Sequence, residues 1–219
     1  MTQIFDGIEF LGILPVIAIE DAAQALPLAD ALLEGGLPAV EITFRTAAAT
    51  EVIARMAQDR PELLVGAGTL LDPASIDLAR SSGARFGLAP GFDLETFDRA
   101  ADLGFPFAPG VMTPSDLSAA TRRGARILKF FPAGTAGGPK ALASIAAPFA
   151  HLGIKFVPTG GVSQANLGEW LSLPYVAAVG GTWIAPTGDI RAGRWAEITK
   201  RCREAVAAAK SFRPRPAAS

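Results

Sequence analysis

The feature that most constrains this chain is an alternation, repeated eight times, between a short apolar run and a segment with helical spacing. The apolar runs cover residues 13–19, 39–44, 63–69, 85–90, 105–111, 126–132, 155–161 and 176–184. Most are apolar on both faces, as expected of parallel strands that are covered by helices. Eight consecutive β–α units predict a closed, compact α/β fold, a (β/α)8 TIM barrel. An open, doubly wound sheet is the alternative, which is disfavoured because no dinucleotide-binding fingerprint follows the first run.

The segments between the runs carry helix start and stop signals, such as Asp or Thr at the N-cap and Pro at the first helical position. Expected helices cover residues 21–34, 46–58 and 73–82, and further helices begin at Asp93, at Thr113, near Gly138, at Ser163 and near Arg191. Residues 1–12 are expected to form a short helix that closes the bottom of the barrel with Ile4, Phe5 and Ile8. No linker divides the chain, so residues 1–210 are predicted to form one domain. Residues 211–219 are predicted to be a short disordered tail.

Composition narrows the possible functions. Half of the 219 residues are hydrophobic and the net charge is −1, which is typical of a globular protein and gives no electrostatic case for nucleic acid or an anionic membrane as a partner. The single cysteine, Cys202, excludes an internal disulfide, and with the single histidine, His151, it excludes zinc sites built on these two residue types. The first twelve residues contain no lysine or arginine, so they do not resemble a secretory signal and a cytoplasmic location is expected.

One lysine is placed unusually. Lys129 lies in the sixth run, RILKFFP, where its neighbours are all apolar. Burial removes the hydration of an ammonium and lowers the pKa of a lysine, by up to about 3–5 units when desolvation is complete. A neutral lysine is a nucleophile toward carbonyl carbons. The alternative is that Lys129 reaches the surface along its aliphatic stem or pairs with an acid for structural reasons.

A carboxylate is placed just as unusually in the second run, VEITFR. Glu41 lies between two apolar residues, and Thr43 and Arg45 share its side of the strand because side chains alternate with a period of two. Both Glu41 and Lys129 can therefore face one barrel interior, near the carboxyl ends of the strands where such barrels hold their active sites. A structural ion pair is the alternative, although a buried pair is weak evidence of stabilisation.

Two glycine pairs follow the last two runs. Gly160-Gly161 and Gly180-Gly181 end the seventh and eighth runs, and Thr182 follows the second pair. This is the place where (β/α)8 barrels commonly bind phosphate through backbone N–H groups. The two pairs together predict a phosphate site.

The motifs VEITFRT, VGAGT, APG, PGVMTPS, LKFFPA, PTGGVS and VGGTW occur in this order between residues 13 and 186. In this order they resemble the bacterial 2-keto-3-deoxy-6-phosphogluconate (KDPG) aldolases of the KDPG/KHG class I aldolase family. The resemblance implies a lyase that cleaves a phosphorylated keto-sugar acid to pyruvate and glyceraldehyde 3-phosphate in the Entner–Doudoroff pathway, with neither a metal nor another cofactor. It also implies a homotrimer.

The resemblance assigns a role to each site residue. Lys129 would form the Schiff base, and Glu41 would be the general acid and base. Arg45 and Thr69 would hold the pyruvate carboxylate, Pro90 and Phe131 would line the pocket, and Thr159 would face the substrate hydroxyls. The 6-phosphate would be bound by Gly160, Gly161, Gly180, Gly181 and Thr182.

Small departures from the family pattern leave the reacting groups in place. Thr182 stands where the family commonly has Ser, Ala89 where it often has Ser, and Val157 where many members have Cys. A sister family that acts on the galactonate-derived phosphate carries an Arg after the first strand and lacks one after the second, whereas this chain has Arg45 and no Arg in PVIAIED.

Several other activities stay open. Aldol cleavage of 4-hydroxy-2-oxoglutarate, decarboxylation of oxaloacetate and cleavage of the galactonate analogue would use the same lysine. A phosphate-binding barrel isomerase or epimerase, or a non-catalytic phosphosugar-binding protein, would use the glycine pairs without a Schiff base.

Overall fold

The computed structural model describes residues 2–212, and each of the eight apolar runs contains a strand or a pair of strands. The strands are β1 (Ile13–Ile17), β2 (Ala39–Thr43), β3 (Leu64–Gly68), β4 (Phe86–Leu88), β5 (Phe107–Ala108), β6 (Gly110–Val111), β7 (Ile127–Phe130), β8 (Lys155–Pro158) and β9 (Val179–Gly181). The fifth run is divided because Pro109 separates β5 from β6 and has no N–H to donate to a neighbouring strand.

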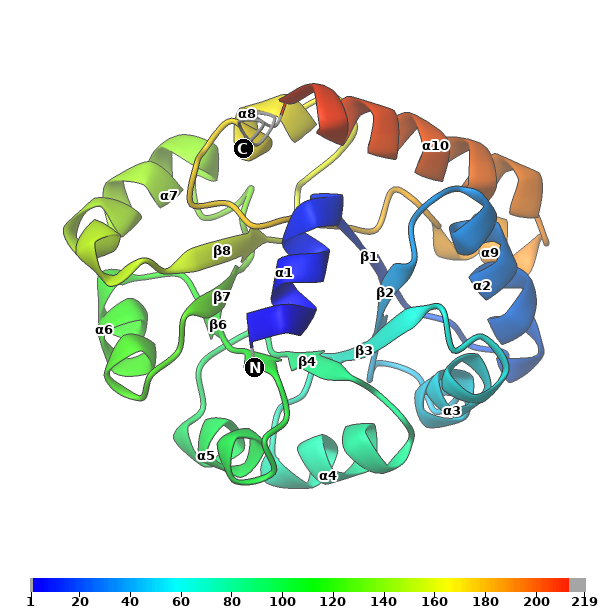
Figure 1. Ribbon diagram of the computed structural model, residues 1–219, viewed down its shortest axis with the longest axis horizontal. Helices are drawn as coiled ribbons and strands as arrows, with labels where there is room; N and C mark the ends of the chain where they lie inside the picture. Colours follow the sequence, from blue (N-terminus) through cyan, green and yellow to red (C-terminus); the bar gives the residue numbers. More distant parts are fainter. Residues whose placement is uncertain (1, 213–219) are drawn as a thin grey trace.

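The strands are arranged around a barrel (Figure 1), which confirms the expected fold over the open sheet. All pairings are parallel, in a six-stranded sheet of order β5-β4-β3-β2-β1-β9 and a three-stranded sheet of order β6-β7-β8. Two isolated parallel bridges, Phe156↔Val176 and Thr159↔Gly180, join the β8 side to the β9 side. On the other side, the two sheets meet within one chain segment at Pro109.

Helices cover the outside of the barrel (Figure 1). They are α2 (Ala25–Glu34), α3 (Ala49–Asp59), α4 (Pro73–Ser81), α5 (Leu94–Asp102), α6 (Pro114–Arg122), α7 (Gly138–Ala146), α8 (Leu167–Leu171), α9 (Thr187–Arg191) and α10 (Trp195–Phe212), with 3-10 turns η1 (Ala22–Gln24) and η2 (Ala147–Leu152). Asp72, Asp93 and Thr113 cap α4, α5 and α6 by accepting hydrogen bonds from the N–H three residues later. None of the helices within residues 2–212 has the length and apolar character that crossing a bilayer requires.

Three expected helices differ from the sequence interpretation. The helix expected over residues 46–58 begins only at Ala49, after a turn at residues 44–48. The helix placed at Ser163 begins only at Leu167, because the Asn166 side chain accepts from the Ser163 N–H at 2.9 Å and holds a turn before the helix. The last expected helix is two helices, α9 and α10, separated by a turn in which Gly193 has a φ of 63°. α10 continues through Phe212, beyond the expected start of the tail at residue 211, and residues 213–219 lie outside the described part of the chain.

The short helix α1 (Thr2–Leu11) closes one end of the barrel, as expected (Figure 1). Its Phe5 and Ile8 are buried against an inner cluster of residues from the strands and, for Ala178, from the segment just before β9: Leu14, Ala39, Phe86, Leu88, Ala108, Val157 and Ala178. An ion pair at 3.0 Å between Glu9 of α1 and Lys155 at the start of β8 supports this position. Because this end is filled, the polar side chains of the interior can meet a ligand only at the carboxyl ends of the strands.

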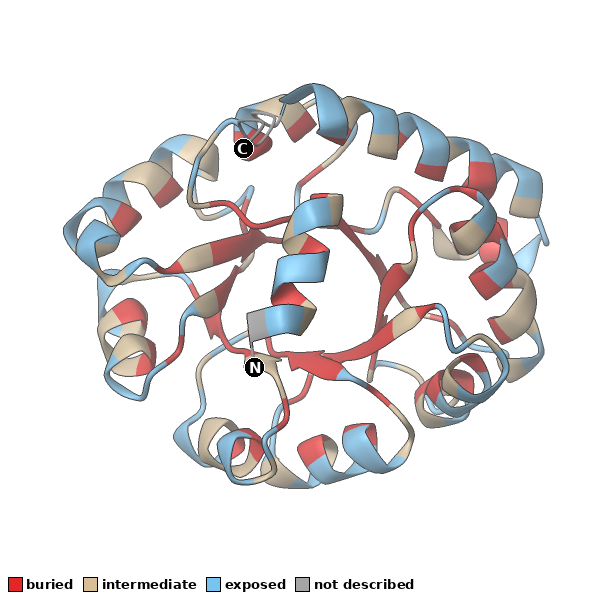
Figure 2. Ribbon diagram, in the orientation of Figure 1, coloured by how far each residue is buried: buried red, intermediate tan, exposed pale blue. Residues whose placement is uncertain are grey.

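A second and larger cluster lies between the strands and the outer helices, whose inner faces are buried (Figure 2). Cys202 of α10 belongs to it and is fully buried. It contacts α2 at Gly35, where a side chain of any size would overlap the Cys202 side chain. Cys202 is therefore part of the hydrophobic core.

Cys202 is expected to be unreactive in the folded protein. Burial raises the pKa of its thiol to about 12, so the nucleophilic thiolate is scarce at pH 8. Iodoacetamide should label the native protein negligibly and label it fully in guanidinium. Because the pKa is raised in the folded state, this thiol should also make stability fall as pH rises above 9, and that fall should be smaller in Cys202→Ala. Rapid labelling of native protein would contradict the burial of this side chain.

Candidate active site

A buried lysine and a buried glutamate meet in the barrel interior. Lys129 Nζ of β7 donates a hydrogen bond to Glu41 Oε1 of β2 at 2.8 Å, and the side chains are 5% and 0% exposed. The two residues are 88 positions apart in the chain. The other carboxylate oxygen, Glu41 Oε2, is buried and has no hydrogen-bond partner among the described residues. The pair therefore keeps one oxygen available for a further donor, such as a substrate hydroxyl or a water molecule.

Glycine on the neighbouring strand makes room for this pair. Gly68 of β3 pairs in register with Thr43 of β2, and a Cβ added to Gly68 would overlap the Glu41 carboxylate. The next residue, Thr69, has a φ of 62°, a left-handed conformation that a β-branched residue rarely adopts. The motif VGAGT thus combines a space for Glu41 with a strained turn at the carboxyl end of β3.

An aromatic residue and a proline lie near the lysine of the buried pair. The Phe131 ring centroid lies 5.7 Å from Lys129 Nζ, within the range of a cation–π interaction. Gly110 of β6 pairs with Lys129, and a Cβ on Gly110 would overlap the backbone of Pro90. Close approach of Pro90 to the strand beside Lys129 is thus possible only because residue 110 is glycine. Pro90 itself lines a separate pocket of about 200 Å³ with Leu70 and Phe92.

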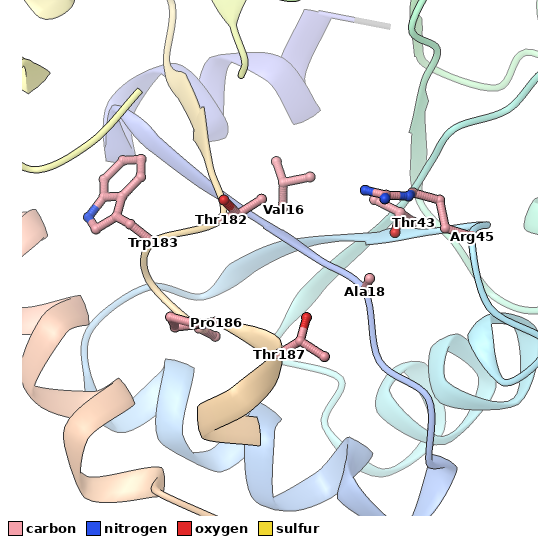
Figure 3. A pocket seen from close by; sticks show the side chains of 9 residues that line it. Val16, Ala18, Thr43, Arg45, Thr182, Trp183, Pro186 and Thr187 are labelled. Atoms are coloured by element: carbon pink, nitrogen blue, oxygen red, sulfur yellow. The ribbon is translucent and has the colours of Figure 1, made fainter. Parts of the chain in front are cut away.

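A cavity of about 370 Å³ opens at the carboxyl ends of β1, β2 and β9. Figure 3 shows Arg45, from the segment after β2, and Thr182, from the segment after β9, on either side of Val16. The remaining lining residues are Ala18, Thr43, Trp183, Ala185, Pro186 and Thr187. Glu41 and Lys129 do not line this cavity. Thr43, two positions after Glu41 on the same face of β2, connects the cavity with the buried pair.

Arg45 is an exposed cation in this cavity. Within residues 2–212 its guanidinium makes neither a hydrogen bond nor an ion pair, whereas Arg55 and Arg60 on nearby α3 and its C-cap bond to carboxylates. A guanidinium without a protein partner can bind a carboxylate or phosphate through two parallel hydrogen bonds. With the Thr182 hydroxyl across the same cavity, the arrangement is suited to an anionic ligand.

The two glycine pairs meet at the ends of β8 and β9, as the predicted phosphate site requires. Gly160 and Gly161 have φ of 89° and 80°, and their N–H groups donate to no described residue. Thr159 is bridged to Gly180, and a Cβ on Gly180 would overlap the Thr159 hydroxyl. The Asn166 side chain holds the turn at Gly160 and Gly161, because its Nδ2 donates a hydrogen bond to the Gly161 carbonyl at 2.9 Å.

Sequence reasoning missed three polar residues here. Asn166 holds the Gly161 turn, Thr187 lines the cavity, and Thr46 bonds to the Ile19 carbonyl, two residues after β1. An Asn three residues after Ser163 is a recognisable turn signal, but nothing in the sequence links Thr187 or Thr46 to the cavity. Among residues 2–212, no cluster of three or more His, Cys, Asp or Glu side chains could hold a metal ion.

Comparison with known proteins places these features in a family. A family model described as KDPG and KHG aldolase matches residues 6–201. The 2-dehydro-3-deoxy-phosphogluconate aldolase of Pseudomonas aeruginosa is 46% identical over 194 residues, which are 89% of this chain and 87% of that protein.

Solved structures give the same result. The KDPG aldolase of Legionella pneumophila, with pyruvate captured as a covalent carbinolamine, has a TM-score of 0.88 and 36% identity over 93% of this chain and 98% of that one. The 2-keto-3-deoxy-6-phosphogluconate aldolase of Zymomonas mobilis with 3-phosphoglycerate has a TM-score of 0.86 and 36% identity, over 93% and 95% of the two chains.

Gly68→Ala is expected to destabilise the fold by about 1–3 kcal/mol, because the new methyl group must displace the buried Glu41 carboxylate. Gly91→Ala is the matched control, since no atom lies within 4 Å of a Cβ at that position. Urea denaturation of the two variants and the parent protein gives the comparison. Equal midpoints for both variants would show that Glu41 does not need the space beside Gly68.

Proposed function

This chain belongs to the KDPG and KHG aldolase family, and on that premise we propose that it is a class I aldolase that cleaves 2-dehydro-3-deoxy-6-phosphogluconate to pyruvate and glyceraldehyde 3-phosphate. The observation that carries this proposal is the 2.8 Å hydrogen bond between Lys129 and Glu41 in the barrel interior. A buried ion pair adds little to the stability of a barrel, because the cost of desolvating the two charges offsets their attraction. A nucleophilic amine beside a proton acceptor is what Schiff-base chemistry requires.

The first step uses the hydrogen bond directly. When a proton passes from Lys129 Nζ to Glu41 Oε1, the amine becomes neutral and attacks the C2 carbonyl carbon of the keto acid. The resulting carbinolamine loses water as Glu41 returns a proton, and an iminium forms. The Legionella relative holding pyruvate as a carbinolamine supports this assignment.

Bond cleavage follows because the iminium accepts electrons. A base removes the proton of the C4 hydroxyl, the C3–C4 bond breaks, and glyceraldehyde 3-phosphate leaves while an enamine remains on Lys129. Protonation at C3 and hydrolysis then release pyruvate and restore the amine. Glu41 Oε2, buried and without a hydrogen-bond partner among residues 2–212, is the oxygen suited to hold the water or hydroxyl that exchanges these protons.

The two ends of the substrate carry negative charge, and the proposal assigns each to one part of the barrel mouth. Arg45 and Thr69 bind the carboxylate, with Pro90 and Phe131 beside the reacting carbons. Thr159 faces the substrate hydroxyls. The phosphate is bound by the N–H groups of the glycine pairs and by the hydroxyl of Thr182. Binding at the distant phosphate orients the keto group for attack.

A second candidate substrate is 4-hydroxy-2-oxoglutarate, since the matching family model includes KHG aldolases by its description. It would use the same lysine and the same carboxylate site but would place a second carboxylate where the phosphate lies. The ratio of kcat/KM for the two substrates decides between them. The homotrimer and the cytoplasmic location implied by the resemblance also belong to this proposal, and sedimentation and cell fractionation test them.

Borohydride should trap pyruvate on Lys129. Incubation with pyruvate, reduction and peptide mass spectrometry are expected to find the reduced adduct on the peptide that contains Lys129, and Lys129→Ala should lose it. Lys155→Ala is the control, because Lys155 is also paired with a glutamate but lies at the opposite end of the barrel. An adduct on another residue, or none in folded protein, would refute the Schiff-base assignment.

Glu41→Gln is expected to lower kcat for aldol cleavage by roughly 10²- to 10⁴-fold, because the amide cannot exchange protons. KM should change much less, since the substrate anions are bound elsewhere. Glu9→Gln is the matched control and should leave kcat unaltered. A steady-state assay of pyruvate release measures both constants, and a Glu41→Gln enzyme with kcat near that of the parent would show that another group moves the protons.

A further inference from the structure

The segment that carries Arg45 lies beyond the regular sheet. β2 ends at Thr43, the Phe44 N–H donates to the Gly68 carbonyl at 2.8 Å, and α3 begins at Ala49. In between the chain turns, with the Arg45 N–H donating to the Thr43 carbonyl at 2.8 Å. Pairing between strands therefore fixes the backbone only as far as residue 44.

Two threonine hydroxyls tie this turn to the last residue of β1 and to the segment that follows it. Thr43 Oγ1 donates to the Ile17 carbonyl at 3.2 Å, and Thr46 Oγ1 donates to the Ile19 carbonyl at 2.6 Å. The two bonds flank Arg45 in the sequence. Thr43 is also held within β2, whereas Thr46 lies outside the strand, so its hydroxyl supplies a restraint that the sheet does not. The 2.6 Å distance is at the short end of the O–H···O range.

The Arg45 side chain depends on this restraint. It lines the cavity without any bond to another described residue, so no side-chain partner orients its guanidinium. The position of the backbone at residue 45 therefore determines which parts of the cavity the guanidinium can reach. An unrestrained turn would spread the guanidinium over many positions, and binding an anion would then cost additional ordering entropy.

We propose that Thr46 is a positioning residue, whose hydrogen bond to the Ile19 carbonyl holds the turn at residues 44–48 so that Arg45 faces the bound keto acid. The inference rests on the proposed function, in which Arg45 binds the substrate carboxylate. Thr46 does not line the cavity, so it acts through Arg45 and not on the substrate.

The test is Thr46→Val, which keeps the shape of the side chain and removes the hydroxyl, with Thr46→Ala measured alongside in case the extra methyl group impairs folding. The first readout is the pyruvate concentration that gives half-maximal borohydride trapping on Lys129. The second is the pair kcat and KM for aldol cleavage. We expect the half-saturating pyruvate concentration and KM to rise roughly five-fold and kcat to stay within about two-fold. Thr46→Ser, which retains the hydroxyl, should stay close to the parent protein.

Thr121→Val is the matched control. Thr121 Oγ1 of α6 donates to the Leu117 carbonyl at the same 2.6 Å and is likewise half-buried. Its loss should leave pyruvate saturation unchanged, because this hydrogen bond lies within α6 and away from the turn that carries Arg45. The proposal is overturned if Thr46→Val saturates with pyruvate as Thr121→Val does. It is also overturned if Thr46→Ser is as impaired as Thr46→Val, because retaining the hydroxyl would then fail to preserve pyruvate binding.

Failure of the proposed function gives a different pattern. If the parent protein traps no pyruvate, the Schiff-base function fails and the role of Thr46 fails with it. If the parent protein traps pyruvate but does not cleave the phosphorylated acid, only the proposed substrate fails, and the trapping comparison still decides the role of Thr46.

Discussion

The hydrogen bond between Lys129 and Glu41 is the interaction around which the interior of this barrel is arranged. Each partner would be costly to bury alone, and each is acceptable because the other lies 2.8 Å away. Two neighbouring positions are glycine: Gly68 leaves space for the carboxylate, and Gly110 allows Pro90 to approach β6, the strand beside Lys129. Two further departures from ordinary packing lie at this level of the barrel: the turn at Thr69, and Glu41 Oε2, which has no hydrogen-bond partner in the described part of the chain. Such departures concentrate where function outweighs stability.

The opposite end of the barrel follows ordinary packing rules. Phe5 and Ile8 of α1 fill the interior against the early residues of the strands, and Phe5 makes an edge contact with the Phe86 ring. Lys155 and Glu9 form an ion pair there as well, but both are about one-third exposed, so water shares their solvation. The same two residue types thus form a partly exposed ion pair at one end and, at the other, the buried pair that we propose to be reactive. Burial is what separates the two roles.

Much of this arrangement could be predicted from the sequence, because its main signals are local. The eight apolar runs predict the barrel. An ionisable residue inside an apolar strand is conspicuous in any sequence, so Lys129 and Glu41 can be identified from the sequence alone. Pro109 could have signalled the division of the fifth strand. The remaining features depend on contacts between distant segments. Thr46 meets Ile19 across 27 positions, and Gly68 matters only because a side chain of the neighbouring strand occupies its space. No local pattern reports such contacts.

The break at Pro109 divides the chain into two parts that hold different chemistry. The part before it contains β1 to β5 and carries Glu41, Arg45, Thr69 and Pro90. The part after it contains β6 to β9 and carries Lys129, Phe131, Thr159 and both glycine pairs. Neither part is a smaller version of the whole, since one holds the proton acceptor and the other the amine. The architecture repeats eight times, but the side chains at its centre do not repeat. A barrel made by duplicating one half would have the same fold, yet it would place either two carboxylates or two amines at the centre.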